Sequence, residues 1–104
     1  MTENQLQLTD IDGGKLLACP EYFDISVVTE FHQTLVNLLA EKPDNITFDV
    51  EKVEIIDTSI LQSACAFMHD AEKEGIGVEW KNASESVCQS AQSLGLDRFL
   101  KLEC

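Results

Sequence analysis

Residues 46–50, ITFDV, decide the fold of this chain, because a short apolar alternation here separates two longer helical patterns. Ile46, Phe48 and Val50 alternate with polar residues, which is the period of a half-buried β-strand. The segment 77–81, GVEWK, repeats the extended pattern after the second helical stretch. Strands that alternate with helices pair in parallel through right-handed crossovers, so the sequence predicts an α/β fold.

The same periodicity, followed outward in both directions, predicts the remaining elements. The expected order is β-β-α-β-α-β-α, a mixed sheet with helices packed against it, in a single domain over residues 1–104. The buried arc of the second helix is predicted to contain Leu61, Ala64, Cys65 and Met68. The other expected elements are strands at 6–11 and 15–19 joined by a turn at 12–14, a loop at 20–24, a helix at 25–40, a helix from Ser59 to Gly75, a helix from an Asn82–Glu85 capping box to Gly95, and a helical turn at 96–100.

The charge of the chain restricts its partners. Nineteen acidic residues stand against seven basic ones in 104, for a formal net charge of −12. Nucleic acids and anionic membranes repel such a surface, so we expect neither as a partner. The N-terminus lacks the basic and apolar segments of an export signal, and the apolar runs are too short to span a bilayer. We therefore expect a cytoplasmic protein without direct membrane insertion.

The sequence offers little for catalysis or metal binding. It contains no Gly-rich phosphate loop and no nucleophile elbow, so we expect neither an enzyme nor a cofactor. The four cysteines are widely separated, and no Cys-x-x-Cys pair is present. Cys65 and Cys88 are predicted to be small buried hydrophobes in a reducing compartment, with no metal and no disulfide. His32 and His69 are predicted to lie on exposed helix positions.

The segment 55–61, IIDTSIL, is the one candidate functional motif. Ser59 with Gln62 fits a capping box at the start of the second helix, although Asp57 or Thr58 are also suitable caps. A plain cap explains one hydroxyl and leaves the other polar side chains without a role. A phosphate on Thr58 would lie near free backbone N–H groups and the positive end of a helix dipole. The residues alone leave the plain cap and the phosphorylation switch as alternatives.

The chain resembles the STAS family, the domain of sulfate transporters and anti-sigma-factor antagonists, over nearly its whole length. The most specific match is the aliphatic-Asp-[Ser/Thr]-[Ser/Thr] turn at residues 56–59. Residues 20–24 occupy the place of the family's Gly-Glu-Leu-Asp loop, and residues 93–96 match the end of its last long helix. Two departures are Ile60, where the family usually has Gly, and an early loop that is one residue longer.

The resemblance implies a regulatory protein that binds other proteins. The phosphoacceptor of the family maps to Thr58, with Asp57 and Ser59 supporting it, and the modifying partner would be an anti-sigma factor or a signalling kinase of the serine-kinase type. The alternative is a constitutive, unphosphorylated binding module, such as an accessory subunit of a chemotaxis-type complex or of a phospholipid transporter. An oligomer is possible. The residues predicted to contact the partner are Asp24, Ile60, Ser63 and Ala66.

Overall fold

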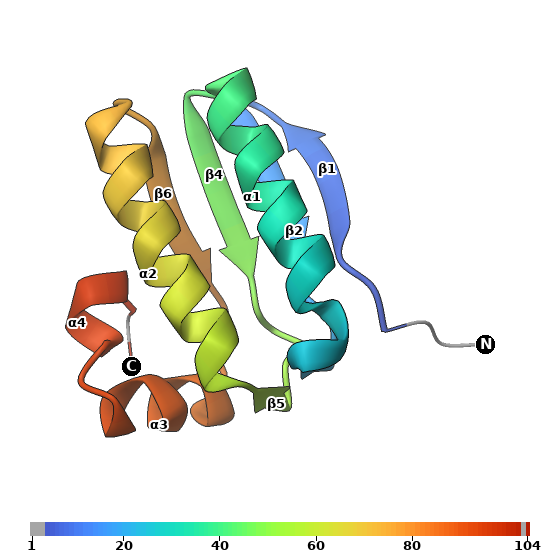
Figure 1. The fold of residues 1–104 in the computed structure, drawn as a ribbon, viewed down its shortest axis with the longest axis vertical. Helices are drawn as coiled ribbons and strands as arrows, with labels where there is room; N and C mark the ends of the chain where they lie inside the picture. The colour runs from blue at the N-terminus through green and yellow to red at the C-terminus, as the bar shows by residue number, and fades with distance from the viewer. Residues whose placement is uncertain (1–3, 103) are drawn as a thin grey trace.

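The structure is a computed structural model that describes residues 4–102 and 104. The chain folds around one sheet, with its longest helices on one side of it (Figure 1). In chain order the elements are β1 (Gln7–Ile11), β2 (Gly14–Ala18), β3 (Tyr22–Phe23), the 3-10 helix η1 (Ile25–Val27), α1 (Val28–Glu41), β4 (Asn45–Asp49), β5 (Ile55–Ile56), α2 (Thr58–Lys73), β6 (Gly77–Lys81), α3 (Glu85–Ser93) and α4 (Asp97–Leu100).

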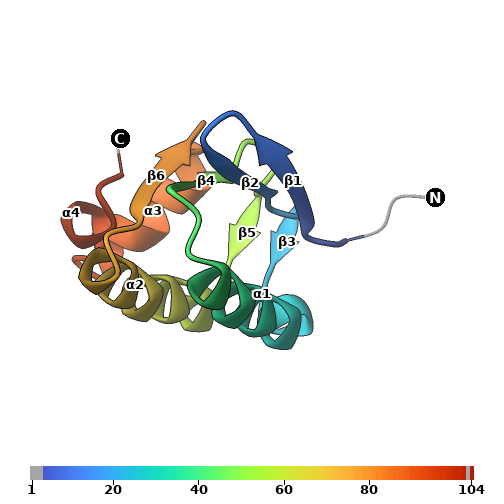
Figure 2. The same cartoon turned by 90° about the horizontal axis from the view of Figure 1, so that it is seen from above.

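The main sheet has the strand order β1-β2-β4-β6. β1 pairs antiparallel with β2, whereas β2 with β4 and β4 with β6 pair in parallel. The predicted mixed sheet and hairpin are therefore confirmed. In this register Leu17, Phe48 and Trp80 are direct neighbours on adjacent strands. Figure 2 shows α1 and α2 side by side beneath this sheet. The Phe48 ring contacts Phe31 of α1 and Phe67 of α2, so its side chain lies on this face.

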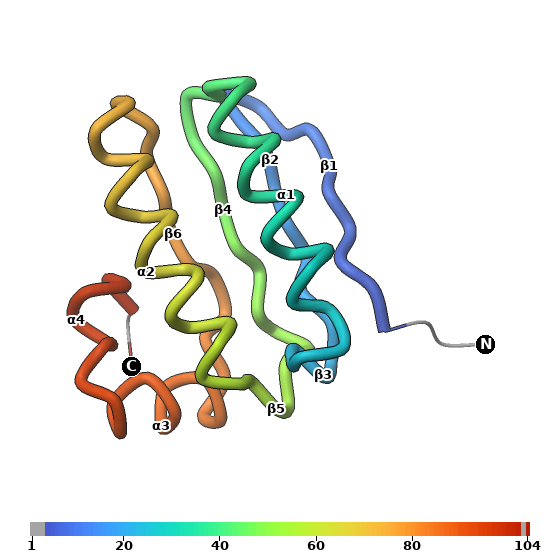
Figure 3. The backbone as a smooth tube through the Cα atoms, in the orientation of Figure 1, coloured from blue at the N-terminus to red at the C-terminus, as the bar shows by residue number. Residues whose placement is uncertain are grey.

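A second, two-stranded parallel sheet joins β3 to β5, whereas the sequence had predicted a loop at residues 20–24 and no strand at 55–56. The pairing begins with the Glu54 N–H, which donates to the Glu21 carbonyl at 2.8 Å. It ends with the Asp57 N–H, which donates to the Phe23 carbonyl at 3.0 Å. The tube in Figure 3 brings the two segments together just before α2 begins. Strands of two residues are too short for periodicity to reveal, so the loop prediction was wrong here.

The core forms between the sheet and the two long helices, as the apolar stripes predicted. Phe48 is fully buried in its centre, with ring centroids 6.2 Å from Phe31, 5.8 Å from Phe67 and 4.7 Å from Trp80. Burial of such rings contributes roughly 25 cal/mol per Å² of apolar surface. On α2 the buried residues are Ile60, Leu61, Ala64, Phe67, Met68 and Ala71, which confirms the predicted helix phase.

The third helix begins at a different residue from the one predicted. Ser84, not Asn82, is the N-cap of α3: its Oγ accepts from the Val87 N–H at 3.3 Å and donates to the Val53 carbonyl at 3.0 Å. Asn82 instead has a left-handed backbone with φ of 60° and bonds Asp49 through its side chain at 3.3 Å. The predicted Asn82–Glu85 capping box is therefore wrong. Serine is also a favoured N-cap residue, and Ser84, two residues later, takes that position instead.

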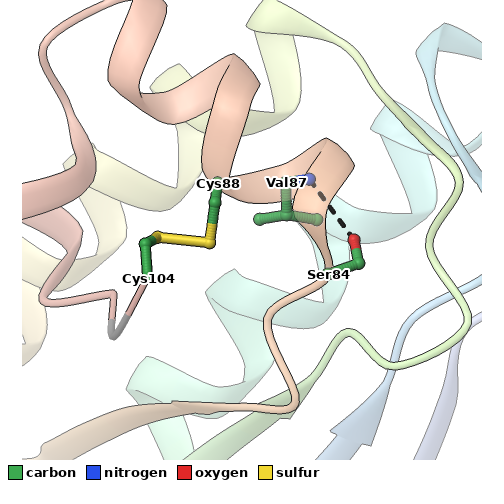
Figure 4. Close-up of a disulfide and its surroundings, with 4 residues drawn as sticks. All are labelled: Ser84, Val87, Cys88 and Cys104. Carbon is green, nitrogen blue, oxygen red and sulfur yellow. Dashed lines mark hydrogen bonds between the residues drawn. A yellow bond between two sulfur atoms is a disulfide. The ribbon is translucent and has the colours of Figure 1, made fainter.

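The cysteine prediction also needs correction. Cys88 is half-buried and forms a disulfide with Cys104, the last residue of the chain (Figure 4). Cys65 is half-buried rather than buried, and only Cys19 behaves as the small core residue that was expected for such thiols. The separation of 16 residues between the partners hid the pair, because their proximity arises from the packing of the C-terminal segment and not from local spacing.

Candidate functional site

Thr58 is the first residue of α2, and its side chain is exposed. Asp57, in extended backbone conformation with φ of −86° and ψ of 151°, is the N-cap. The first helical hydrogen bonds run from the N–H groups of Ile60 and Leu61 to the Asp57 carbonyl, at 3.1 and 3.2 Å. The N–H groups of Thr58 and Ser59 therefore belong to the free donors at the positive end of the helix.

The predicted capping box at this helix is wrong. The helix begins two residues too early for Ser59 to be its N-cap, and the Asp57 side chain makes no capping hydrogen bond. The Ser59 Oγ is instead buried, with no hydrogen-bond partner among the residues that the structure describes. Because the helix starts at Thr58, Ser59 is turned toward the packed side of the first turn. Its hydroxyl therefore does not hold the helix start together.

Asp24 lies on the neighbouring segment, directly after β3. Phe23 and Ile56 are register partners, and the Asp57 N–H donates to the Phe23 carbonyl, so Asp24 and Asp57 directly follow two paired strands. Asp24 is the N-cap of η1, and its Oδ1 accepts from the Ser26 Oγ at 2.5 Å and from the Ser26 N–H at 3.0 Å. These side-chain and backbone hydrogen bonds hold the pKa of Asp24 below its ordinary value. Asp24 thus has a clear structural role, and its contact with a partner stays a prediction.

The exposed side of α2 carries most of the other predicted contact residues. Thr58 and Ala66 are exposed, and Ser63 is half-buried. Residues four apart lie above one another on a helix, so Thr58 and Ala66, two such steps apart, share one face. Ile60 is the exception: its side chain is fully buried in the core. The prediction that Ile60 contacts a partner is therefore wrong, because it offers no surface to one.

Three large apolar side chains near Thr58 were missed by the sequence analysis. Tyr22, Ile25 and Ile55 are 44%, 73% and 53% exposed, and we call them the apolar cluster. Tyr22 and Ile55 are register partners in the β3–β5 pair. Ile25 comes two residues after β3, as Thr58 comes two residues after β5. An available signal was the pair of isoleucines at 55 and 56, because successive strand residues point to opposite faces.

An acidic groove adjoins the apolar cluster. It is open, has a volume of about 750 Å³, and runs past Tyr22, the 51–54 loop and the start of α3. Hydrogen bonding with the Glu21 carboxyl, and then repulsion by its charge, raise the pKa of Glu54 above its ordinary value. The pairing of β3 with β5 draws these two carboxyls together, since the Glu54 N–H donates to the Glu21 carbonyl.

The site combines polar groups with exposed apolar surface. Within residues 4–102 and 104, no three His, Cys, Asp or Glu side chains are grouped to hold a metal ion. No helix in that part of the chain has the length and apolar character needed to cross a bilayer. What the site offers is an exposed hydroxyl at a helix start, free backbone donors and adjacent exposed apolar surface. These are features of a protein-binding surface.

Several solved structures share this fold with the chain, including the following three. An anti-sigma factor antagonist from Mycobacterium paratuberculosis superposes with a TM-score of 0.76 at 21% identity, covering 90% of this chain and 80% of that one. The anti-sigma factor antagonist SpoIIAA in its unphosphorylated form has a TM-score of 0.76 at 17% identity, covering 91% and 84%. A serine-to-glutamate variant of RsbS from Moorella thermoacetica has a TM-score of 0.74 at 20% identity, covering 89% and 80%.

Identities this low establish the fold alone. A comparison with curated protein sequences finds no match. The STAS domain model, in contrast, matches residues 5–103, from just before β1 to the residue before the last. Because that match spans almost the whole chain, the protein belongs to the STAS domain family.

Proposed function

We propose that this chain is a cytoplasmic regulatory domain that docks onto another protein through the surface around Thr58, and that phosphorylation of Thr58 by a partner serine kinase weakens this docking. It would act by binding and not by catalysis, in the manner of an anti-sigma-factor antagonist. Relatives with this fold include SpoIIAA, whose structure is known in unphosphorylated and phosphorylated forms. The proposal extends that likeness to this chain.

The observation that carries the proposal is the exposed Thr58 hydroxyl beside the apolar cluster. Tyr22, Ile25 and Ile55 supply surface whose burial favours association, and Ala66 leaves room for close approach along α2. A hydroxyl at the edge of such a surface is neutral and easily desolvated. A phosphate in its place carries about −1.5 to −2 charges.

The charges of the site indicate how the phosphate would act. Ion pairs among the described residues join Lys15 to Asp10 and Glu41, and Lys42 to Glu74. In Figure 1 the C-terminal end of α1 lies at the top of the molecule and the start of α2 at the bottom, so these cations are remote from Thr58. None of these ion-paired cations would therefore neutralise the phosphate, whose charge would be offset in part by the free N–H groups at the start of α2. Burying an unpaired dianion at an interface costs several kcal/mol, enough for an affinity loss of about 100-fold.

A constitutive binding module is the second candidate, and the apolar cluster itself favours it. Three exposed apolar side chains can dock a partner whether or not Thr58 is ever modified. In that case Thr58 would be an ordinary exposed first-turn residue.

The deciding experiment measures partner affinity for Thr58 variants. The partner is first captured from lysate of the native host, identified, and purified, and its affinity is then measured by titration calorimetry. We expect Thr58→Glu to weaken binding by at least tenfold, and Thr58→Ala to leave it within about twofold, since the N-cap is Asp57. Asn37→Glu, an equal charge change on the exposed face of α1, is the matched control and should have no effect.

Intact-mass analysis of the protein from its own host complements the titration. A phosphate at Thr58 under some growth condition is expected. If no phosphate is ever found and Thr58→Glu binds like the wild type, the switch is refuted. Loss of binding in Ile25→Ser would then support the constitutive module, and unchanged binding in that variant would place the docking surface elsewhere.

A further inference from the structure

The disulfide between Cys88 and Cys104 ties the end of the chain to the middle of α3 (Figure 4). The Cα atoms of the two residues are 5.8 Å apart, well inside the range that a disulfide spans without backbone movement. Cys104 is exposed and Cys88 half-buried, so the bond is within reach of small thiols in solution. The loop that it closes contains α4.

The fold delivers Cys104 to Cys88 by a sharp reversal after α4. The Leu102 N–H donates to the Asp97 carbonyl at 3.0 Å and the Lys101 N–H to the Arg98 carbonyl at 3.1 Å. These bonds form a Schellman-type helix end. Lys101 adopts the left-handed conformation this turn requires, with φ of 62°.

Little else holds this segment in place. An isolated helix of four residues is unstable in water, and a left-handed non-glycine residue adds a conformational cost. Docking depends on Leu100, which is fully buried within the main core, and on the half-buried Leu102. We call α4 with Lys101 and Leu102 the C-terminal latch, because the disulfide is the covalent part of its attachment.

The two remaining cysteines are poor competitors for thiol–disulfide exchange. Burial, with a smaller effect of the Asp49 charge, raises the pKa of the Cys19 thiol far above its ordinary value. Burial also raises the pKa of the Cys65 thiol. Exchange requires an accessible thiolate, so both residues are expected to stay reduced while Cys88 and Cys104 react.

We propose that Cys88 and Cys104 form a reversible thiol–disulfide couple that locks the C-terminal latch onto α2 and α3. The oxidant is a low-molecular-weight disulfide of the glutathione class. The Cys104 thiolate attacks one of its sulfurs, forming a mixed disulfide and releasing one glutathione thiolate. The Cys88 thiolate then attacks the Cys104 sulfur, releasing the second. Two protein thiols are oxidised and one glutathione disulfide is reduced to two thiols, which take up the two protons that the protein thiols lose.

In the dithiol state the latch opens locally. Leu100 then leaves its place in the core. The open groove of about 580 Å³ that Met68, Ile76 and Phe99 line loses the wall formed by Phe99 and Lys101. α4 packs mainly against α2 and α3, so we expect α1 and β4 to stay in place when the latch opens. The inference concerns the pure protein and is independent of the function proposed for Thr58.

The couple is tested by equilibrating the full chain in anaerobic buffers of defined reduced-to-oxidised glutathione ratio. The samples are quenched in acid and alkylated under denaturing conditions, and the number of alkylated cysteines is counted by intact-mass spectrometry. We expect one transition between a species with four alkylated cysteines and a species with two, in which Cys88 and Cys104 are linked. Four alkylated cysteines at every ratio, or a stable glutathione adduct on Cys104, would overturn the couple.

Hydrogen exchange followed by mass spectrometry tests the latch on the same samples. Amides of residues 97–102 should exchange about tenfold faster or more in the dithiol form, while those of α1 and β4 change little. In Cys104→Ser, the amides of residues 97–102 should exchange rapidly at every glutathione ratio. Cys65→Ser is the matched control and should show the same change of exchange with glutathione ratio as the wild type. Equal exchange of residues 97–102 in the dithiol and disulfide forms would refute the latch.

Discussion

Replacing Ser59 by Ala and, separately, Ser84 by Ala tests how the structure assigns the helix caps. Both serines lie at the start of a helix and both changes remove the same hydroxyl. Ser84 accepts from the Val87 N–H and donates to the Val53 carbonyl, whereas the buried Ser59 Oγ has no partner among the described residues. The same substitution should therefore have opposite effects at the two positions.

The expected magnitudes follow from these contacts. Ser84→Ala leaves a helix donor and a loop carbonyl without their partner, which should lower the free energy of unfolding by about 1–2 kcal/mol. Ser59→Ala removes a buried hydroxyl that makes no bond and introduces the best helix former. It should leave the free energy of unfolding unchanged or raise it by up to about 1 kcal/mol.

Urea unfolding followed by the fluorescence of Trp80, the single tryptophan of the chain, measures both effects. Trp80 contacts Phe48 in the core, so its signal reports global unfolding. The slope of the unfolding free energy with urea should be the same in both variants, and reductant should be left out so that the disulfide stays intact. If Ser59→Ala costs as much as Ser84→Ala, Ser59 is a cap after all and the start of α2 described above is wrong.

Two further predictions concern the sheet and its acidic neighbourhood. Gly14→Ala should lower the free energy of unfolding by about 1–3 kcal/mol, because the added Cβ would overlap the Asn45 carbonyl. Gly77→Ala is the control: its added Cβ would meet no atom closer than the Asn45 Oδ1 at 3.5 Å, so the free energy should change by less than about 1 kcal/mol. Urea unfolding measures both variants. Glu21→Gln should lower the pKa of Glu54 toward its ordinary value in an NMR titration. In the wild type, the raised pKa lowers the stability as pH rises from the ordinary pKa of a glutamate to the raised pKa of Glu54, and the variant should lose this effect. An unchanged pKa of Glu54 would contradict this.

Much of the fold could be predicted because it depends on local periodicity. The apolar stripe of α1, with Phe31, Leu35 and Leu38, is buried as its spacing indicated. The inward arc of α2 is confirmed in the same way, Met68 included. Element ends were less predictable, since several polar residues near each start are suitable caps and tertiary contacts choose among them. Asn82 and Ser84 illustrate this choice at α3.

The candidate site shows the same division. The position of Thr58 at an exposed helix start was evident from the change of pattern at residues 55–61, and so was the acid before it. That Ile60 is buried also followed from the helical period, although its assignment to a partner surface conflicted with that period. The apolar cluster was not evident, because its members come from two segments whose pairing no local signal announces.

The sequence by itself determined the four strands of the main sheet, the longer helices with their buried apolar faces, and the polar turn that begins α2. These depend on the order of apolar and polar side chains within single segments. Only the tertiary structure decided the β3–β5 pair, the inward turn of the Ser59 hydroxyl and the bond between Cys88 and Cys104. Each of these depends on the distance between residues remote along the chain, and that distance is set only when the helices pack on the sheet.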